Sequence, residues 1–412
     1  MNKISEKIKK ILATNKNLSR VASGDFISNL IGALFWLYIA ALLTPEEYGE
    51  ITYLISIAAF ASTLSMLGAY NSLVVLTAKN VKIQSTISLI SSSVGLVAAI
   101  VVFFTVNQVE VGVLIFAYIL TNLIIPHVLG KKEFNEYFRI IVFSKILSVA
   151  SSLILFYFIG HIGIIIGLAT PIFLFGFKIF HIFRTIRIDF RLLKTHSKFI
   201  ITNYGLNVSD SISGSLDKII IVPILGFAVL GSYQLGLQFL GILMIIPLIV
   251  YKITLPDDAR GILNKKLKVV TVSVAFGLGI LSFLLIPIII PVLNSSYNES
   301  ILPIQIIALS SIPGSIALMY WSRFIGTEKN KVLLAGSVIY ATSLISLIII
   351  LGQEFHSLGL AFAFFLSHCI SMAYFICVNY FGHLPKIITK IFSTYMFIKI
   401  CNKYFSVDII FF

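Results

Sequence analysis

The stretch from Lys268 to Val292 reads KVVTVSVAFGLGILSFLLIPIIIPV and decides the fold class of this chain. After Lys268 it holds no charged residue. As an α-helix, rising about 1.5 Å per residue, it exceeds the roughly 30 Å of a bilayer's hydrocarbon core. A helix pairs its own backbone groups, which lipid cannot do. The stretch therefore predicts a membrane-spanning helix.

Stretches of the same kind recur along the chain. Apolar residues form 58% of its 412 residues and charged residues 12%, against about half and about a quarter in soluble domains. The mean hydropathy is +1.00. We predict an all-α integral membrane protein with about twelve transmembrane helices. The predicted spans are 21–43, 51–76, 84–106, 112–130, 139–160, 162–183, 199–225, 229–253, 268–292, 301–323, 332–352 and 357–381.

Basic residues predict the orientation of these spans. All but Lys145 and Lys218 of the 31 Lys and Arg residues lie in the two tails, in every second connection or at the span ends that border these connections, and the other connections hold none. Cytoplasmic connections are enriched in Lys and Arg. We therefore predict both termini in the cytoplasm. Because topology explains the net charge of +14, we predict no nucleic-acid partner.

An internal repeat divides the predicted spans into two sets of six. An offset of 182 residues aligns three identical pairs at equivalent places: Gly32 with Gly214, Leu43 with Leu225, and Gly49 with Gly231. Six spans per half make the repeats parallel, as in transporters whose two bundles rock about a substrate site. The predicted regions are a basic cytoplasmic N-tail 1–20, an N-terminal six-helix bundle 21–183, a basic cytoplasmic linker 184–198, a C-terminal six-helix bundle 199–381 and a cytoplasmic or interfacial tail 382–412.

Polar residues form a stripe on the predicted span 199–225. Successive spacings of four, three, four and three place its members on one helix face. The stripe consists of Asn203, Asn207, Asp210, Gly214 and Asp217, with Lys218 beside it. A charge at the bilayer centre costs about 2.5 to 3.5 kcal/mol on insertion scales, so such groups face a cavity or a partner. We predict that the stripe lines a substrate cavity. For its small polar members, hydrogen bonding between helices is an equally good interpretation.

Other spans offer further candidate cavity residues. They are Asp25 and Asn29 in 21–43, Lys145 in 139–160, Arg323 at the end of 301–323, and Tyr233 and Gln238 in 229–253. Tyrosine and glutamine suit hydrogen bonding to sugar hydroxyls. The competing interpretations are an interfacial position for Asp25, snorkelling of Lys145 toward the membrane surface and core packing of Tyr233.

Catalytic and metal-binding signatures are missing from the sequence. It has no Walker A loop, G-x-S-x-G or H-E-x-x-H motif, and Ser215 to Lys218 fits S-x-x-K without its companion motifs. The three cysteines show no metal-ligand spacing. We therefore predict a protein that is not an enzyme and has no catalytic residue, metal or bound cofactor. Uphill transport would draw on a coupling proton or Na⁺, or on consumption of the substrate.

Two passages carry a family resemblance. Residues 43–49 read LTPEEYG, and the second half contains LDKIII at 216–221 followed by GSYQLG at 231–236. The first resembles the L-x-P-x-E-Y-G junction of Wzx-type polysaccharide (O-antigen) flippases, and the second resembles that family's D-K-hydrophobic and G-x-Y passage. These flippases belong to the multidrug/oligosaccharidyl-lipid/polysaccharide exporter superfamily.

The resemblance implies a function, a location and partners. Such flippases move an undecaprenyl-diphosphate-linked oligosaccharide across the bacterial inner membrane by alternating access, for lipopolysaccharide or related polysaccharide biosynthesis. A glycan polymerase, a chain-length regulator and membrane lipids are the implied partners. Lys218, Lys145 and Arg323 would be the cationic partners of the diphosphate. The acidic candidates would bind a coupling ion or position those cations.

Two other functions stay open at this point. A cation-coupled multidrug or metabolite exporter would have the same fold, and a deep acidic pocket would favour it. A membrane glycan polymerase or acyltransferase usually has a large outer loop or a catalytic His/Asp/Arg set. The sequence shows neither feature, since connections such as 44–50 and 294–299 are short.

Overall fold

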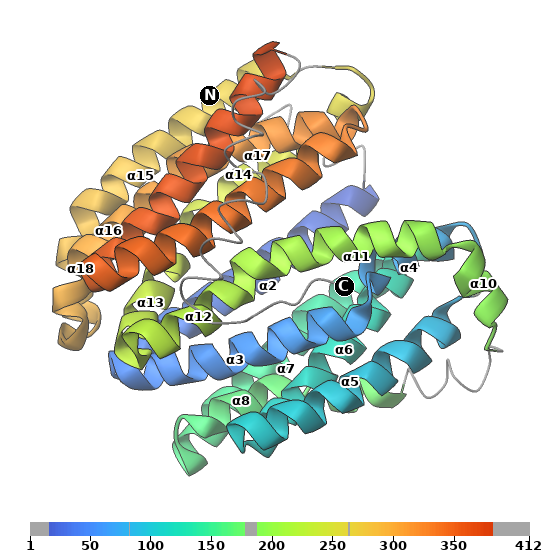
Figure 1. Ribbon diagram of the computed structural model, residues 1–412, viewed down its shortest axis with the longest axis horizontal. Coiled ribbons are helices and arrows are strands. Elements are labelled where there is room, and N and C mark those ends of the chain that lie inside the picture. Colours follow the sequence, from blue (N-terminus) through green and yellow to red (C-terminus); the bar gives the residue numbers. More distant parts are fainter. Residues whose placement is uncertain (1–15, 82, 178–187, 263, 382–412) are drawn as a thin grey trace, which may run out of the picture. The chain divides into compact units, whose positions relative to one another are not determined.

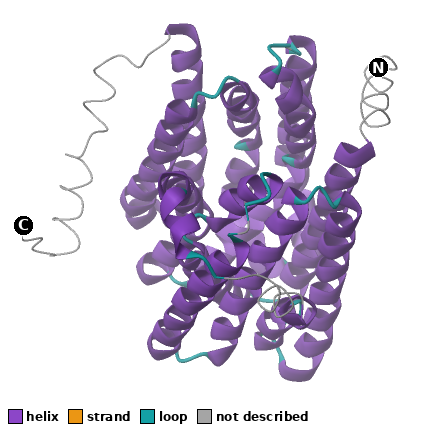
Figure 2. Ribbon diagram, turned by 90° about the vertical axis from the view of Figure 1, so that its right-hand side faces the viewer, coloured by secondary structure: helices purple, strands orange, loops and turns teal. Residues whose placement is uncertain are grey.

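The computed structural model describes residues 16–81, 83–177, 188–262 and 264–381, which are almost entirely helical and contain no strand (Figure 2). Figure 1 labels the elements. The first are α2 (Lys16–Leu42), α3 (Pro45–Met66), α4 (Ala69–Ala78), α5 (Gln84–Val106), α6 (Val109–Gly130), α7 (Phe134–Ile159) and α8 (Ile162–Ala169). Then follow α10 (Phe190–Thr195), α11 (Ser197–Ser211), the π-helical turn η1 (Ile212–Leu216), α12 (Asp217–Leu225), α13 (Phe227–Leu243) and α14 (Ile245–Ala259). The last are α15 (Lys265–Leu293), the 3₁₀ turn η2 (Ser295–Ser300), α16 (Ile301–Leu309), α17 (Ser311–Gly326) and α18 (Asn330–Phe381).

Contacts between elements divide the chain into two compact units. The first unit comprises Met1–Gln238 with Leu293–Tyr297, and the second comprises Phe239–Val292 with Asn298–Phe412. In the first, α7 packs against α2 and α8, and α3 packs against α5 and α6. In the second, α17 packs against α14 and α18. The predicted bundles and linker stay a prediction, and residues 1–15, 184–187 and 382–412 of the predicted tails and linker lie outside the described residues.

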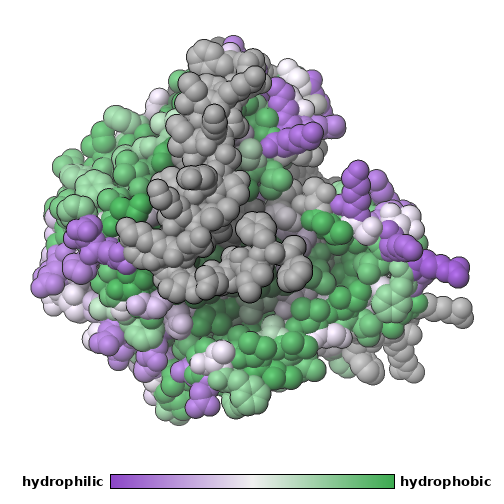
Figure 3. Space-filling model, viewed as in Figure 1, coloured by the Kyte–Doolittle hydropathy of each residue, from purple (hydrophilic) through white to green (hydrophobic). Residues whose placement is uncertain are grey.

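Long apolar helices show that this is a multi-pass membrane protein. Within the described residues, eight helices are long and apolar enough to cross a bilayer, or nine if the pair Phe227–Leu243 and Ile245–Leu255, bent by 47°, is one span. Apolar side chains cover wide parts of the face shown in Figure 3. Several large ones are more than 80% exposed, including Phe158, Phe173 and Val292. Water would make such exposure unfavourable, whereas acyl chains are an apolar solvent for it.

Local breaks occur both inside the predicted spans and between them. The predicted span 51–76 consists of α3 and α4, which are separated by Leu67 and Gly68, both with positive φ (48° and 76°). The predicted spans 332–352 and 357–381 both lie in α18, which is interrupted at His356 (φ 49°, ψ −127°). Twelve spans with cytoplasmic termini therefore stay a prediction.

The LTPEEYG passage starts α3 with a complete capping box. The Glu47 amide donates to Thr44 Oγ1 at 3.3 Å, and the Thr44 amide donates to Glu47 Oε2 at 2.9 Å. Pro45 occupies the first helical turn, where its missing N–H removes no intrahelical bond. Helix α3 consequently begins before residue 51, the predicted start of that span.

Candidate functional site

Two repeat-equivalent glycines bring α3 and α13 into backbone contact. A Cβ on Gly49 would overlap with the carbonyl of Phe227, and a Cβ on Gly231 would overlap with the carbonyl of Pro45. Pro45 and Phe227 are separated by 182 residues, as Gly49 and Gly231 are. Each glycine therefore contacts the residue that is equivalent to the partner of the other glycine. Reciprocal contacts of this kind define a local two-fold relation. The contact lies within the first unit, and the six-plus-six repeat stays a prediction.

The predicted stripe does not lie on a continuous α-helix. Helix α11 ends at Ser211, the π turn η1 follows, and α12 begins at Asp217. A π turn holds an extra residue, which rotates everything after it by about 100° relative to an uninterrupted helix. Asn203 and Asn207 before the turn are therefore not related to Asp217 by the simple α-helical spacing.

Asp217 and Lys218 form a buried ion pair with Tyr233. Asp217 is 0% exposed and Lys218 is 8% exposed. Lys218 Nζ donates to the carbonyl of Gly214 at 2.6 Å and lies 3.5 Å from Asp217 Oδ1. The Tyr233 hydroxyl, from α13, donates to Asp217 Oδ2 at 3.0 Å. Adjacent residues on a helix point about 100° apart, but the flexible lysine reaches back over the π turn and meets its neighbour.

The two asparagines of the stripe bind helix α4. Asn71 Nδ2 donates to Asn207 Oδ1 at 3.3 Å. Asn203 Nδ2 lies 3.5 Å from Ser72 Oγ and donates to a carbonyl of its own helix at 3.0 Å. These are bonds of the helix-joining kind. The side chain of Asp210, the third polar member of the stripe, lies outside the described residues.

Lys145 on α7 lies against a glycine that recurs in both halves. A Cβ built on Gly32 of α2 would stand 2.8 Å from Lys145 Cε and 3.0 Å from its Nζ, so the glycine leaves the space that the lysine fills. Lys145 has no hydrogen bond or ion pair with any residue that the structure describes. Gly214, the repeat mate of Gly32, binds Lys218. Each of the two equivalent glycines therefore adjoins a lysine ammonium.

Asp25 and Asn29 occupy different environments on α2. Asp25 is half-buried, and its Oδ1 accepts a hydrogen bond from the Tyr137 hydroxyl of α7 at 2.7 Å. No sequence pattern predicts the pairing of Asp25 with Tyr137. Asn29 is exposed. Asp25 thus joins two helices, and Asn29 presents its amide at the surface of the first unit.

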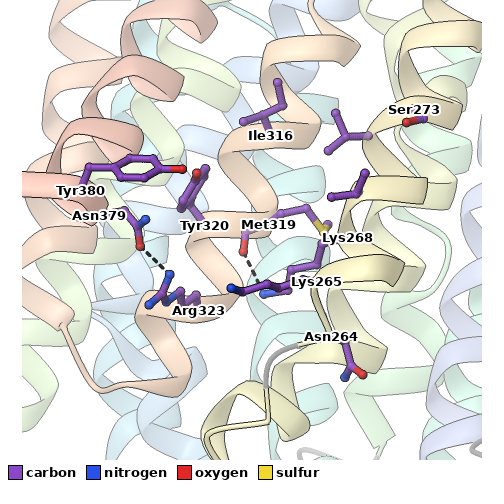
Figure 4. Close-up of a pocket in the computed structure, with 12 residues that line it drawn as sticks. Asn264, Lys265, Lys268, Ser273, Ile316, Met319, Tyr320, Arg323, Asn379 and Tyr380 are labelled. Atoms are coloured by element: carbon purple, nitrogen blue, oxygen red, sulfur yellow. Dashed lines mark hydrogen bonds between the residues drawn. The ribbon is translucent and has the colours of Figure 1, made fainter.

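The last two candidates are Gln238 and Arg323. Gln238 is half-buried on α13. Arg323 belongs to α17 in the second unit, where its Nη1 donates to Asn379 Oδ1 at 2.7 Å inside a cavity (Figure 4). Asn379 lies on α18 and was not a predicted site residue, because nothing in the sequence relates it to α17.

A second buried ion pair was not predicted from the sequence. Lys268 Nζ donates to Asp258 Oδ2 at 2.5 Å and to the carbonyl of Met319 at 3.2 Å. Ser322 Oγ also donates to Asp258 Oδ2 at 2.5 Å. The sequence placed Asp258 in a basic connection, whereas it ends α14 with a fully buried side chain. Its only sequence signal, a lysine ten residues later, is too common to be specific.

No family model and no curated protein sequence matches this chain. Among solved structures it is similar to the lipid II flippase MurJ in an inward closed conformation, with a TM-score of 0.63 and 15% identity over 89% of this chain and 88% of that chain. It is also similar to a multidrug resistance MATE family transporter of the MOP superfamily. The inward-facing conformation gives a TM-score of 0.59 and 11% identity over 85% of this chain and 94% of that chain. The outward-facing conformation gives 0.57 and 12% over 89% and 95%.

These likenesses show the fold. The chain has the all-helical architecture of MOP-superfamily transporters over most of its length, and the similar proteins are flippases and transporters rather than enzymes. At identities of 11 to 15%, similarity to these structures shows the fold and not the substrate. The substrate has to be argued from the side chains within the membrane-spanning helices.

Proposed function

We propose that this chain is a flippase for undecaprenyl-diphosphate-linked oligosaccharide repeat units of O-antigen or a related surface polysaccharide. It would work by alternating access in the bacterial inner membrane, and a glycan polymerase with its chain-length regulator would act on the exported product. The fold is shared by a lipid II flippase and by multidrug transporters, so the fold does not choose between an anionic lipid and a drug. The charges inside the membrane support an anionic lipid as the substrate.

Lys145 is the observation that carries this proposal. Its ammonium lies beside Gly32, between α2 and α7, and no carboxylate within the described ranges pairs with it. A lone cation within a bilayer costs about 2.5 to 3.5 kcal/mol, so it is retained where water or an anionic ligand reaches it. Phosphate oxygens are strong acceptors for a lysine ammonium. An unpaired cation favours a diphosphate substrate over a cationic drug.

The buried pair of Asp217 and Lys218 suggests how transport could be coupled. If Lys218 turned toward a diphosphate, Asp217 would lose its cation and could bind a proton or Na⁺ instead. Substrate and coupling ion would then be linked energetically through one ion pair. Discontinuous helices are where transporters place such sites, and the π turn η1 makes the span that carries this pair discontinuous.

A cation-coupled exporter is the second candidate, because the fold is also that of MATE family transporters. Such a protein would use an acidic group to hold its cationic substrate. The two described acids of the predicted site are already engaged: Asp25 with Tyr137, and Asp217 with Lys218 and Tyr233. A gain of resistance to cationic dyes in cells that express the protein would favour this candidate.

Export of the glycan in cells that depend on this chain tests the proposal. Removing a charge-assisted hydrogen bond removes about 1.5 to 3 kcal/mol, so Lys145→Ala should lower export by about tenfold or more at equal protein levels. Lys145→Arg should retain most of the export because it keeps the charge. Lys79→Ala is the matched control, since Lys79 is exposed in a basic connection of the first unit. Full export by Lys145→Ala would show that the anionic-substrate assignment is wrong.

A further inference from the structure

The second unit contains a cavity of about 710 Å³ between α15, α17 and α18. Figure 4 shows Arg323, Lys265 and Lys268 together near the level at which α15 begins, and Ile316 and Ser273 further along the helices. Lys265 and Ser273 are separated by about 12 Å along α15. The cavity is therefore cationic at one end and mainly apolar along its walls.

The basic residues that line this cavity outnumber the acidic residues that contact them. Lys268 is neutralised by Asp258 at 2.5 Å. Lys265 and Arg323 have no carboxylate partner in the described segments, and none of the described lining residues is Asp or Glu. Arg323 commits one of its five N–H donors, to Asn379. The remaining donors of a planar guanidinium can form two parallel bonds to phosphate oxygens.

The rim of the cavity meets an apolar surface. Val269 on α15 is 64% exposed, and Tyr380 on α18 is 74% exposed. Large apolar side chains remain exposed along the rest of α15, as expected of a helix that faces acyl chains. The positive-inside rule assigns the basic start of α15 to the cytoplasmic side. The cationic end of the cavity would then lie at the headgroup level, with its apolar walls at the level of the chains.

We propose that this cavity binds an anionic phospholipid, with the lipid phosphate against Arg323 and Lys265 and an acyl chain along α15 and α17. Basic pockets between transmembrane helices on the cytoplasmic side suit such headgroups. The lipid supplies the negative charge that this part of the second unit lacks. The proposed function rests on Lys145 of the first unit, whereas this inference rests on Arg323 and Lys265 of the second, so it does not depend on the proposed function.

Thermal unfolding of the purified full chain in a neutral detergent tests the site, together with native mass spectrometry of bound lipid. Phosphatidylglycerol should raise Tm by about 2 °C or more and remain bound, whereas phosphatidylcholine with the same acyl chains should do neither. The double variant Arg323→Gln/Lys265→Gln should lose more than half of the shift. Lys266→Gln is the matched control, because Lys266 is exposed on the same turn but does not line the cavity.

Three outcomes would overturn the proposal. The first is an equal shift with phosphatidylcholine. The second is a full phosphatidylglycerol shift in the double variant. The third is the same shift with inorganic phosphate at matched phosphate concentration, which would make the ligand a free anion. Should the double variant fail to fold, Arg323→Lys and Lys265→Gln, made singly, must each lose part of the shift.

Discussion

Glycines determine where the membrane-embedded lysines of this chain can lie. Gly32 leaves space for Lys145, and Gly214 offers its carbonyl to Lys218. The sequence identified both lysines as the exceptions to an otherwise one-sided distribution of charge, and it aligned both glycines in the repeat. It could not relate either lysine to its glycine, because that proximity depends on the packing of α7 on α2 and on a π turn.

Gly32→Ala should separate the position of Lys145 from the stability of the protein. The new Cβ would meet the flexible end of Lys145, which can move aside, and alanine favours a helix by about 1 kcal/mol over glycine. We expect thermal stability near that of the wild type but reduced glycan export. Gly205→Ala on α11, with open space around it, is the control and should export normally. Wild-type export by Gly32→Ala would mean that the placement of Lys145 does not matter.

The pair of Asp217 and Lys218 should behave as one energetic unit. Removing one partner leaves a buried charge uncompensated, which costs about 3 to 5 kcal/mol. Asp217→Asn and Lys218→Met should each lower the free energy of unfolding strongly, and the double variant should lose much less than their sum. Denaturation of the purified protein measures all four corners of this cycle. Additive losses would show that the 3.5 Å contact contributes nothing.

At the scale of elements, hydropathy does not predict the breaks inside membrane-spanning helices. Every predicted span falls mainly on helical residues in the part of the chain that the structure describes, with short breaks such as Leu67–Gly68 and Met244, because long uncharged segments are unmistakable. The π turn η1 and the positive φ of Leu67 leave hydropathy unchanged, so hydropathy does not predict them, whereas the kink at His356 lies in the predicted connection 353–356. The stripe of span 199–225 was drawn on a straight helix, and η1 divides it: Asn203 and Asn207 bind α4, while Asp217 and Lys218 bind each other.

The contact of α3 with α13 should be sensitive to a single methyl group. Gly49→Ala or Gly231→Ala would press a Cβ into a backbone carbonyl, which cannot move aside as a side chain can. Overpacking of this kind costs about 1 to 3 kcal/mol, so both variants should melt at lower temperature. Gly241→Ala, also on α13 but with no atom within 4 Å, should melt no lower than the wild type. Equal melting temperatures for all three variants would refute a tight contact.

The distribution of charge is the feature that relates sequence to architecture at the scale of the whole molecule. Nearly all the basic residues occupy the two tails and alternate connections or the span ends beside them, and such a pattern depends on the path of the whole chain through the membrane. The chain shares its fold with MOP-superfamily transporters, and the sidedness that the basic residues predict stays a prediction. Buried pairs such as Asp258 with Lys268 could not be foreseen, because they form when two helices pack.

Single cysteines would determine the sidedness of the second unit. After Cys369, Cys377 and Cys401 are replaced by serine, one cysteine is placed at Asn298 or at Lys331, both exposed. The segment between these positions contains α16 and α17, which together form one candidate span, Ser295–Gly326. A membrane-impermeant maleimide should therefore label Asn298→Cys in intact spheroplasts, and Lys331→Cys only after permeabilisation.

Labelling from the opposite sides would invert the predicted topology and would place the cationic cavity beside α15 in the outer leaflet. Labelling of both positions from one side would mean that α16 and α17 do not cross the bilayer. The six-plus-six arrangement would then fail, because each half needs an even number of crossings to begin on the same side. The basic residues predict that the two positions are labelled from different sides. Lys329 and Lys331 follow this span, whereas no Lys or Arg lies between Ile280 and Ser300 before it.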